Sequence, residues 1–76
     1  MTEQIPKAEI VSAIDRLAAR TRAMLRGRLT GLRIEVWGVG VVVRGTANSF
    51  YVKQLAQHAI MTGTALPIVR NEIEVI

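Results

Sequence analysis

The sequence contains no cysteine, one histidine and only three aromatic residues. The absence of cysteine excludes disulfide bonds, thiol catalysis and cysteine-ligated zinc. His58 has no second ligand at a metal-binding spacing, so we predict a surface histidine and no metal. There is no Ser-His-acid arrangement, and Glu35, Glu72 and Glu74 alternate with arginines in predicted strands. We therefore expect a protein that binds rather than catalyses, without a cofactor.

A long apolar segment is also missing. The longest unbroken run of apolar residues and glycine covers residues 36–43, well short of the roughly 20 residues that a membrane-spanning helix needs. The first residues show no apolar core behind a basic start, as a signal peptide would. The sequence as written predicts a cytoplasmic protein that can associate peripherally with a membrane. A sequence trimmed of an export signal would look the same and be periplasmic.

Length and charge limit the remaining possibilities. With 76 residues the chain can form one domain with a thin core, and we expect residues 1–5 to be a flexible N-terminus. The net charge is +4, and eight of the ten basic residues are arginines. Basic domains favour anionic partners such as acidic lipid headgroups or nucleic acid, although a net charge also serves solubility alone.

Hydrophobic periodicity divides the chain into five elements. Residues 6–26 and 48–63 have helical spacing; Asn48 or Ser49 can cap the second helix and Gly63 can end it. Residues 32–37, 41–45 and 69–75 alternate or are rich in β-branched residues, as strands are. The apolar stripe of the first helix contains Ile10, Ile14, Leu17, Thr21 and Met24.

The predicted order α-β-β-α-β defines an α+β fold. A glycine turn makes the first two strands antiparallel, and the second helix makes the last two parallel, so the three-stranded sheet is mixed. Each helix has one apolar stripe, so both should pack on one sheet face. Strand alternation then places these side chains on the open face: Arg33, Glu35, Trp37, Val42, Arg44, Arg70, Glu72 and Glu74.

Residues 32–75 resemble the BON domain (bacterial OsmY and nodulation). The resemblance rests on Ile34-Glu35-Val36, the turn glycines, residues 41–45 and the alanine-rich stretch 53–59. Residues 69–75 are similar to the family ending V-x-N-x-[IL]-x-V. The resemblance implies a non-enzymatic module that attaches to phospholipid surfaces or tethers other domains.

Two sets of side chains are candidates for binding acidic phospholipid or a protein partner. Four arginines of the first helix form like-charged i,i+4 pairs, each costing roughly 0.2–0.5 kcal/mol, which an anionic surface would offset. On the open sheet face, a tryptophan ring can insert at a membrane interface or anchor a protein contact. The alternatives are a solvated helix face and a tryptophan at the core edge. The candidates are Arg16, Arg20, Arg22, Arg26, Arg33, Trp37, Val42 and Arg44.

Other hypotheses remain open beside this BON-like module. A KH-like nucleic-acid-binding domain has a similar element order, but the sequence lacks its GxxG loop and an aromatic pair for stacking bases. Unpaired sheet edges and the Trp37–Val42 pair are also compatible with a homo-oligomer. Gly38 and Gly40 indicate a turn rather than a phosphate loop. Asn71 faces inward and should hydrogen-bond to a loop or a helix end.

Overall fold

The computed structural model describes residues 6–76 and confirms the predicted order of elements. Helix α1 (Lys7–Met24) precedes strands β1 (Leu29–Trp37) and β2 (Gly40–Ala47), helix α2 (Phe50–Gly63) and strand β3 (Ile68–Val75). Helix α1 ends two residues earlier than predicted, and each strand begins one to three residues earlier. The expected flexibility of residues 1–5 lies outside the described part of the chain.

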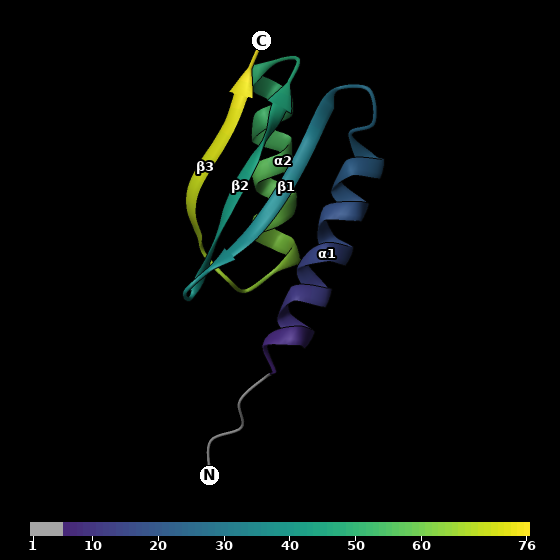
Figure 1. The fold of residues 1–76 in the computed structure, drawn as a ribbon. Helices are drawn as coiled ribbons and strands as arrows, with labels where there is room; N and C mark the ends of the chain where they lie inside the picture. Colours follow the sequence, from purple (N-terminus) through teal and green to yellow (C-terminus); the bar gives the residue numbers. More distant parts are fainter. Residues whose placement is uncertain (1–5) are drawn as a thin grey trace.

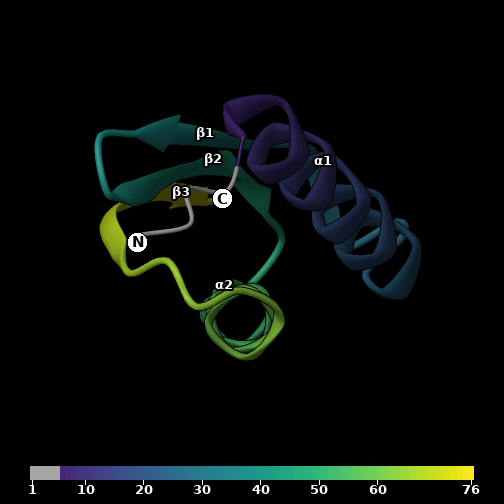
Figure 2. The same cartoon turned by 90° about the horizontal axis from the view of Figure 1, so that it is seen from below.

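The strands form one sheet in the order β1-β2-β3 (Figure 1). Strands β1 and β2 are antiparallel, whereas β2 and β3 are parallel. Both helices lie on one side of this sheet (Figure 2). The fold is therefore the predicted α+β arrangement with a three-stranded mixed sheet. Neither helix is long and apolar enough to span a bilayer within residues 6–76.

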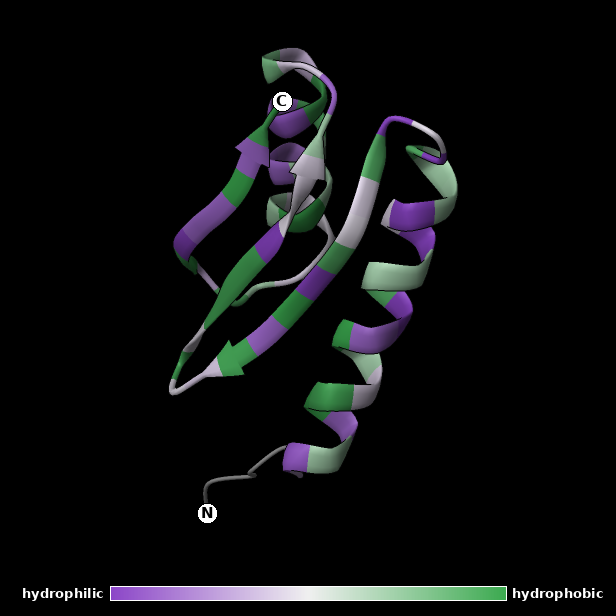
Figure 3. Ribbon diagram, turned by 45° about the horizontal axis from the view of Figure 1, so that its top comes forward, coloured by the Kyte–Doolittle hydropathy of each residue, from purple (hydrophilic) through white to green (hydrophobic). Residues whose placement is uncertain are grey.

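One hydrophobic core fills the space between the helices and the sheet. Buried Thr21 also belongs to this layer, and its Oγ1 donates to Leu17 O at 2.8 Å, which satisfies the hydroxyl. Met24 is 57% exposed and lies outside the core, contrary to the predicted stripe. Figure 3 shows hydrophilic and hydrophobic residues alternating along the hairpin half of β1 and at the C-terminal end of β3. The core consists of Ile14, Leu17, Leu25, Leu29, Leu32, Val41, Val43, Ala47, Val52, Ala56, Ile60 and Ile73.

Two glycines with positive φ shape the β1–β2 hairpin. Gly38, with φ of 61°, is the first of two loop residues between the strands, as a type II′ turn requires. Gly31, with φ of 65°, lies where the pairing register shifts between Thr30 and Arg33. This irregularity is a β-bulge, since β1 gains one residue relative to β2. Leu29 and Leu32 can therefore both face the core although they are three residues apart.

The first and last turns of α2 are shaped by different interactions. At the start, Ser49 Oγ accepts the Val52 N–H at 3.2 Å, which confirms the predicted cap. At the end, Gly63 does not adopt the left-handed conformation that usually makes glycine a helix terminator. A Cβ at Gly63 would instead collide with Leu17 Cδ1 and lie 3.2 Å from Leu17 Cδ2. Glycine at this position thus permits the close approach of α1 and α2.

Candidate functional site

The open sheet face carries a series of ion pairs that links all three strands. Arg44 Nε on β2 lies 3.0 Å from Glu35 Oε1 on β1, and Arg44 Nη2 lies 3.4 Å from Glu72 Oε1 on β3. Glu72 Oε2 lies 3.6 Å from Arg70 Nε. These side chains are partly exposed, so each pair adds at most about 1 kcal/mol. Their main effect is that two of the arginines and two of the glutamates on this face neutralise one another.

The charge balance of the sheet face follows from its composition. Its charged side chains are three arginines and three glutamates, so its net charge is zero. Arg33 stands directly opposite Arg44 in the register and is exposed. A face with zero net charge offers no net attraction to an anionic surface. The six residues are Arg33, Arg44, Arg70, Glu35, Glu72 and Glu74.

Val42 was expected on an exposed contact surface, and this expectation is wrong because the residue has 0% exposure. Val42 lies on the central strand, paired with Glu35 on β1 and Arg70 on β3. It is buried without belonging to the core cluster on the helix side. Long side chains on the neighbouring strands can cover a valine in this position with their aliphatic stems. Val42 is therefore a packing residue.

Trp37 is 49% exposed, as expected, and lies beside the hairpin turn. Val39 and Val69 are also exposed, and Gly40 approaches Val69 so closely that a Cβ would lie 2.5 Å from Val69 Cγ1. Residues 36–43 and 54–69 contain no Asp, Glu, Lys or Arg. The hairpin end of the domain is thus uncharged and partly apolar. Trp37 belongs to this end and not to a surface shared with the arginines of α1.

The four candidate arginines of the first helix do not share one face. Arg22 Nη1 donates to Leu32 O at 3.0 Å, so this side chain reaches toward the β1 bulge. Helical periodicity places Arg16 and Arg20 on the opposite flank, beside α2 and the loop after it. Arg26 follows the end of α1 and lies in the turn before β1. Only Arg16 and Arg20 are therefore neighbours.

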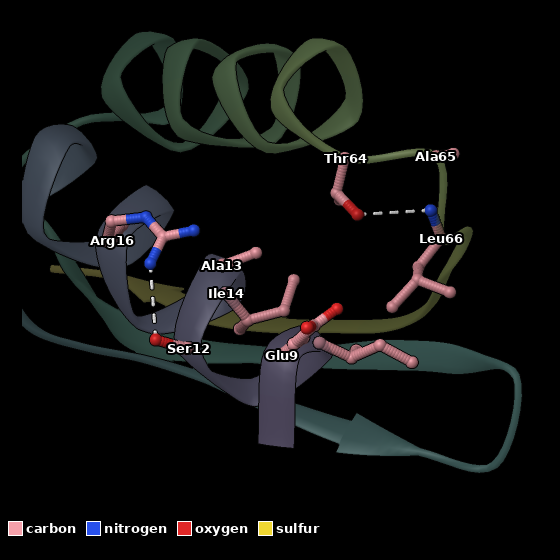
Figure 4. A pocket seen from close by; sticks show the side chains of 9 residues that line it. Glu9, Ser12, Ala13, Ile14, Arg16, Thr64, Ala65 and Leu66 are labelled. Carbon is pink, nitrogen blue, oxygen red and sulfur yellow. Dashed lines mark hydrogen bonds between the residues drawn. The ribbon is translucent and has the colours of Figure 1, made fainter. Parts of the chain in front are cut away.

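Arg16 and Arg20 border a groove that runs along α1, with α2 and the loop after it on the other side; we call it the groove between α1 and α2. The first hollow of this groove has a volume of about 530 Å³ and lies between the N-terminal half of α1 and residues 64–66 (Figure 4). Arg16 Nη1 donates to Ser12 Oγ at 3.2 Å beside it. The second hollow, of about 490 Å³, lies between the C-terminal half of α1 and α2. The apolar walls include Ile10, Ala13, Leu66, Met24, Leu55 and Ala59.

Leu17 and Gly63 separate the two hollows. Leu17 is buried, and its side chain fills the space that a Cβ of Gly63 would need. Ile14 and Thr64 lie on the first-hollow side of this contact, whereas Leu17 and Gly63 themselves line the second hollow. The groove thus consists of two apolar depressions along α1 with the contact of Leu17 and Gly63 between them.

The positive charge of the domain lies on the helix side. Residues 6–28 carry six basic and two acidic side chains, and α2 carries Lys53 and no acid. Within residues 6–76, every ion pair involves the sheet face, and none involves Arg16, Arg20, Arg26 or Arg28. These arginines are free to contact an anionic ligand.

The remaining candidates have structural or surface positions. Asn71 Nδ2 donates to Gln57 Oε1 on α2 at 2.9 Å, and Asn71 Oδ1 accepts the Ile73 N–H at 3.1 Å. The predicted structural hydrogen bond of Asn71 is confirmed, although its partners are the body of α2 and its own strand. His58 is exposed beside the second hollow. No cluster of His, Cys, Asp or Glu in the described range could hold a metal ion.

No protein-family model matches the sequence, and comparisons with characterised proteins and with solved structures give no match.

Proposed function

We propose that this chain is a non-enzymatic attachment module that binds acidic phospholipid surfaces through arginines on its helix side. The observation that carries the proposal is the separation of charge between the two sides of the sheet. The open face has zero net charge, whereas residues 6–28 carry six basic and two acidic side chains. The resemblance of residues 32–75 to the BON domain supports the same class of function.

Arg16 and Arg20 are the central contacts of this proposal. They form an i,i+4 pair of like charges, so anionic headgroups between them would relieve their repulsion. Each basic residue near an acidic membrane contributes roughly 1 kcal/mol. This attraction extends only over a Debye length, about 8 Å at physiological ionic strength. Binding should therefore be weak to moderate and should decrease as salt is raised.

The test is co-sedimentation with phosphatidylcholine vesicles that contain phosphatidylglycerol, over a series of salt concentrations. The variant Arg16→Gln/Arg20→Gln should bind roughly tenfold to thirtyfold more weakly, since two contacts are lost. The matched control is Arg33→Gln/Arg70→Gln, which removes the same charge from the sheet face and should bind like the parent. Equal losses in both variants would show that only net charge matters and would contradict the proposal. Binding to single-stranded RNA but not to these vesicles would favour the KH-like alternative.

A further inference from the structure

We propose that the groove between α1 and α2 is a docking site for an amphipathic helix of another protein with acidic residues along one flank. This inference goes beyond lipid attachment, because it assigns a protein ligand to an apolar feature that headgroups alone would not use. The groove combines apolar depressions with a basic border, which is the pattern of helix-in-groove recognition.

The spacing of the hollows fits a helix. On α1 the first hollow is lined by residues within 9–16 and the second by residues within 17–24, so their centres are about eight residues apart. At a rise of 1.5 Å per residue this separation is about 12 Å, close to two helical turns. Two large apolar side chains at positions i and i+7 of a docked helix can therefore enter the two hollows. The contact of Leu17 with Gly63 between them requires small residues at i+3 and i+4.

The walls of the groove already expose apolar surface. Met24 is 57% exposed, and Ile10, Leu55 and Leu66 are only partly buried. Methionine adapts its shape to different partners, because its side chain is unbranched and polarizable. An incoming apolar side chain would remove this surface from water, which favours the complex through the hydrophobic effect.

The charges of the border select the partner. Arg16 and Arg20 lie on the α1 side, and α2 contributes His58 and no acid. The hydrogen bond from Arg16 to Ser12 holds that guanidinium beside the first hollow. Glu9 lines the first hollow near the start of α1, so the acidic flank must face the arginines and not that end. A second copy of this chain does not supply such a helix, because α1 is basic and α2 has no acidic residue.

The experiment measures binding of a fluorescent synthetic helix to the full chain by anisotropy. The peptide has leucines at i and i+7, alanines at i+3 and i+4, and glutamates along one flank; a second peptide carries lysines instead. The variant Ala13→Phe fills the first hollow from an exposed position and should weaken binding about tenfold or more. The matched control Ala19→Phe adds the same ring to an exposed position of α1 that does not line the groove, and should bind like the parent.

A charge-reversal variant tests whether the basic border selects an acidic helix. Arg20→Glu should weaken binding of the glutamate peptide and improve binding of the lysine peptide. The inference is overturned if the glutamate peptide does not bind, if Ala13→Phe and Ala19→Phe behave alike, or if both peptides bind the parent equally. Vesicle co-sedimentation of Ala13→Phe separates the two proposals, because it retains all arginines. Lost peptide binding with intact vesicle binding supports a function of the apolar hollows in docking a helix that lipid attachment through Arg16 and Arg20 does not need.

Discussion

The contact between Gly63 and Leu17 can be tested by adding one methyl group. In Gly63→Ala the new Cβ would collide with Leu17 Cδ1 and lie 3.2 Å from Cδ2 and 3.3 Å from Cγ. Leu17 is 4% exposed and belongs to the core, so it cannot turn away without losing buried contacts. Either α1 and α2 must separate or the Leu17 side chain must change its conformation.

The expected magnitude follows from two opposing effects. Overpacking of a core contact typically costs about 1–3 kcal/mol. Because Gly63 lacks a positive φ, alanine also restricts the unfolded chain and returns about 0.4–1 kcal/mol. We expect a net loss of roughly 1 kcal/mol, from a total stability of about 4–11 kcal/mol for a chain of this length. The melting temperature should fall by about 4–8 °C.

A double-mutant cycle isolates the contact. Leu17→Ala alone should cost about 2–5 kcal/mol, but it removes the atoms that the new methyl group meets. In that background Gly63→Ala should stabilise the protein by about 0.4–1 kcal/mol, so the effect changes sign. Urea denaturation of the four proteins provides the measurement. An equal loss in both backgrounds would refute the close approach of the helices at Gly63.

Three further substitutions test other parts of the fold by thermal denaturation. Val42→Ala should lower the free energy of unfolding by about 1.5 kcal/mol, at roughly 0.8 kcal/mol per buried methylene, because Val42 is 0% exposed. The control Val39→Ala, at an 82% exposed site, should leave the stability nearly unchanged. Equal stability losses in Val42→Ala and Val39→Ala would place Val42 at the surface. Gly31→Ala should cost about 1–2 kcal/mol through its positive φ alone, since a Cβ there meets nothing within 4 Å. Gly31→Asn should lose less stability, because asparagine tolerates a positive φ better than alanine. Equal losses for the two variants would argue against the bulge. Ser49→Ala should cost about 1 kcal/mol by removing the cap on the Val52 N–H, whereas exposed Ser12→Ala in α1 should not destabilise; equal losses would contradict the assigned cap.

The elements of the fold could be predicted because each has a clear period and a defined boundary. Helix α2 is an example, with a single buried stripe and a Ser49 cap that the sequence already suggests. The start of β1 could not be predicted, because the bulge at Gly31 breaks the alternation. Leu29 and Leu32 both face the core at an odd spacing, which a regular strand does not allow.

The candidate site could be predicted only in part, since periodicity places a residue on a face but does not say what lies opposite. Alternation correctly placed Glu35, Arg44 and Glu72 on the open sheet face. Strand order, which the sequence leaves open, brings these three together across neighbouring strands. The same strand order makes β2 the central strand, so Val42 has neighbours on both β1 and β3 and is buried. On α1, the direction of Arg22 depends on its bond to Leu32 O, a contact between separate elements.

Attachment through Arg16 and Arg20 requires that the helix side of the domain, and not its sheet face, meets the anionic surface. The most direct measurement is paramagnetic relaxation enhancement of backbone amides by spin-labelled phosphatidylglycerol in nanodiscs. Signals of α1 around Arg16 and Arg20 should broaden strongly, whereas those of β3 around Arg70 and Glu72 should stay sharp. Broadening centred on β3 and the Trp37 hairpin, with α1 unaffected, would rule out attachment through the helix side.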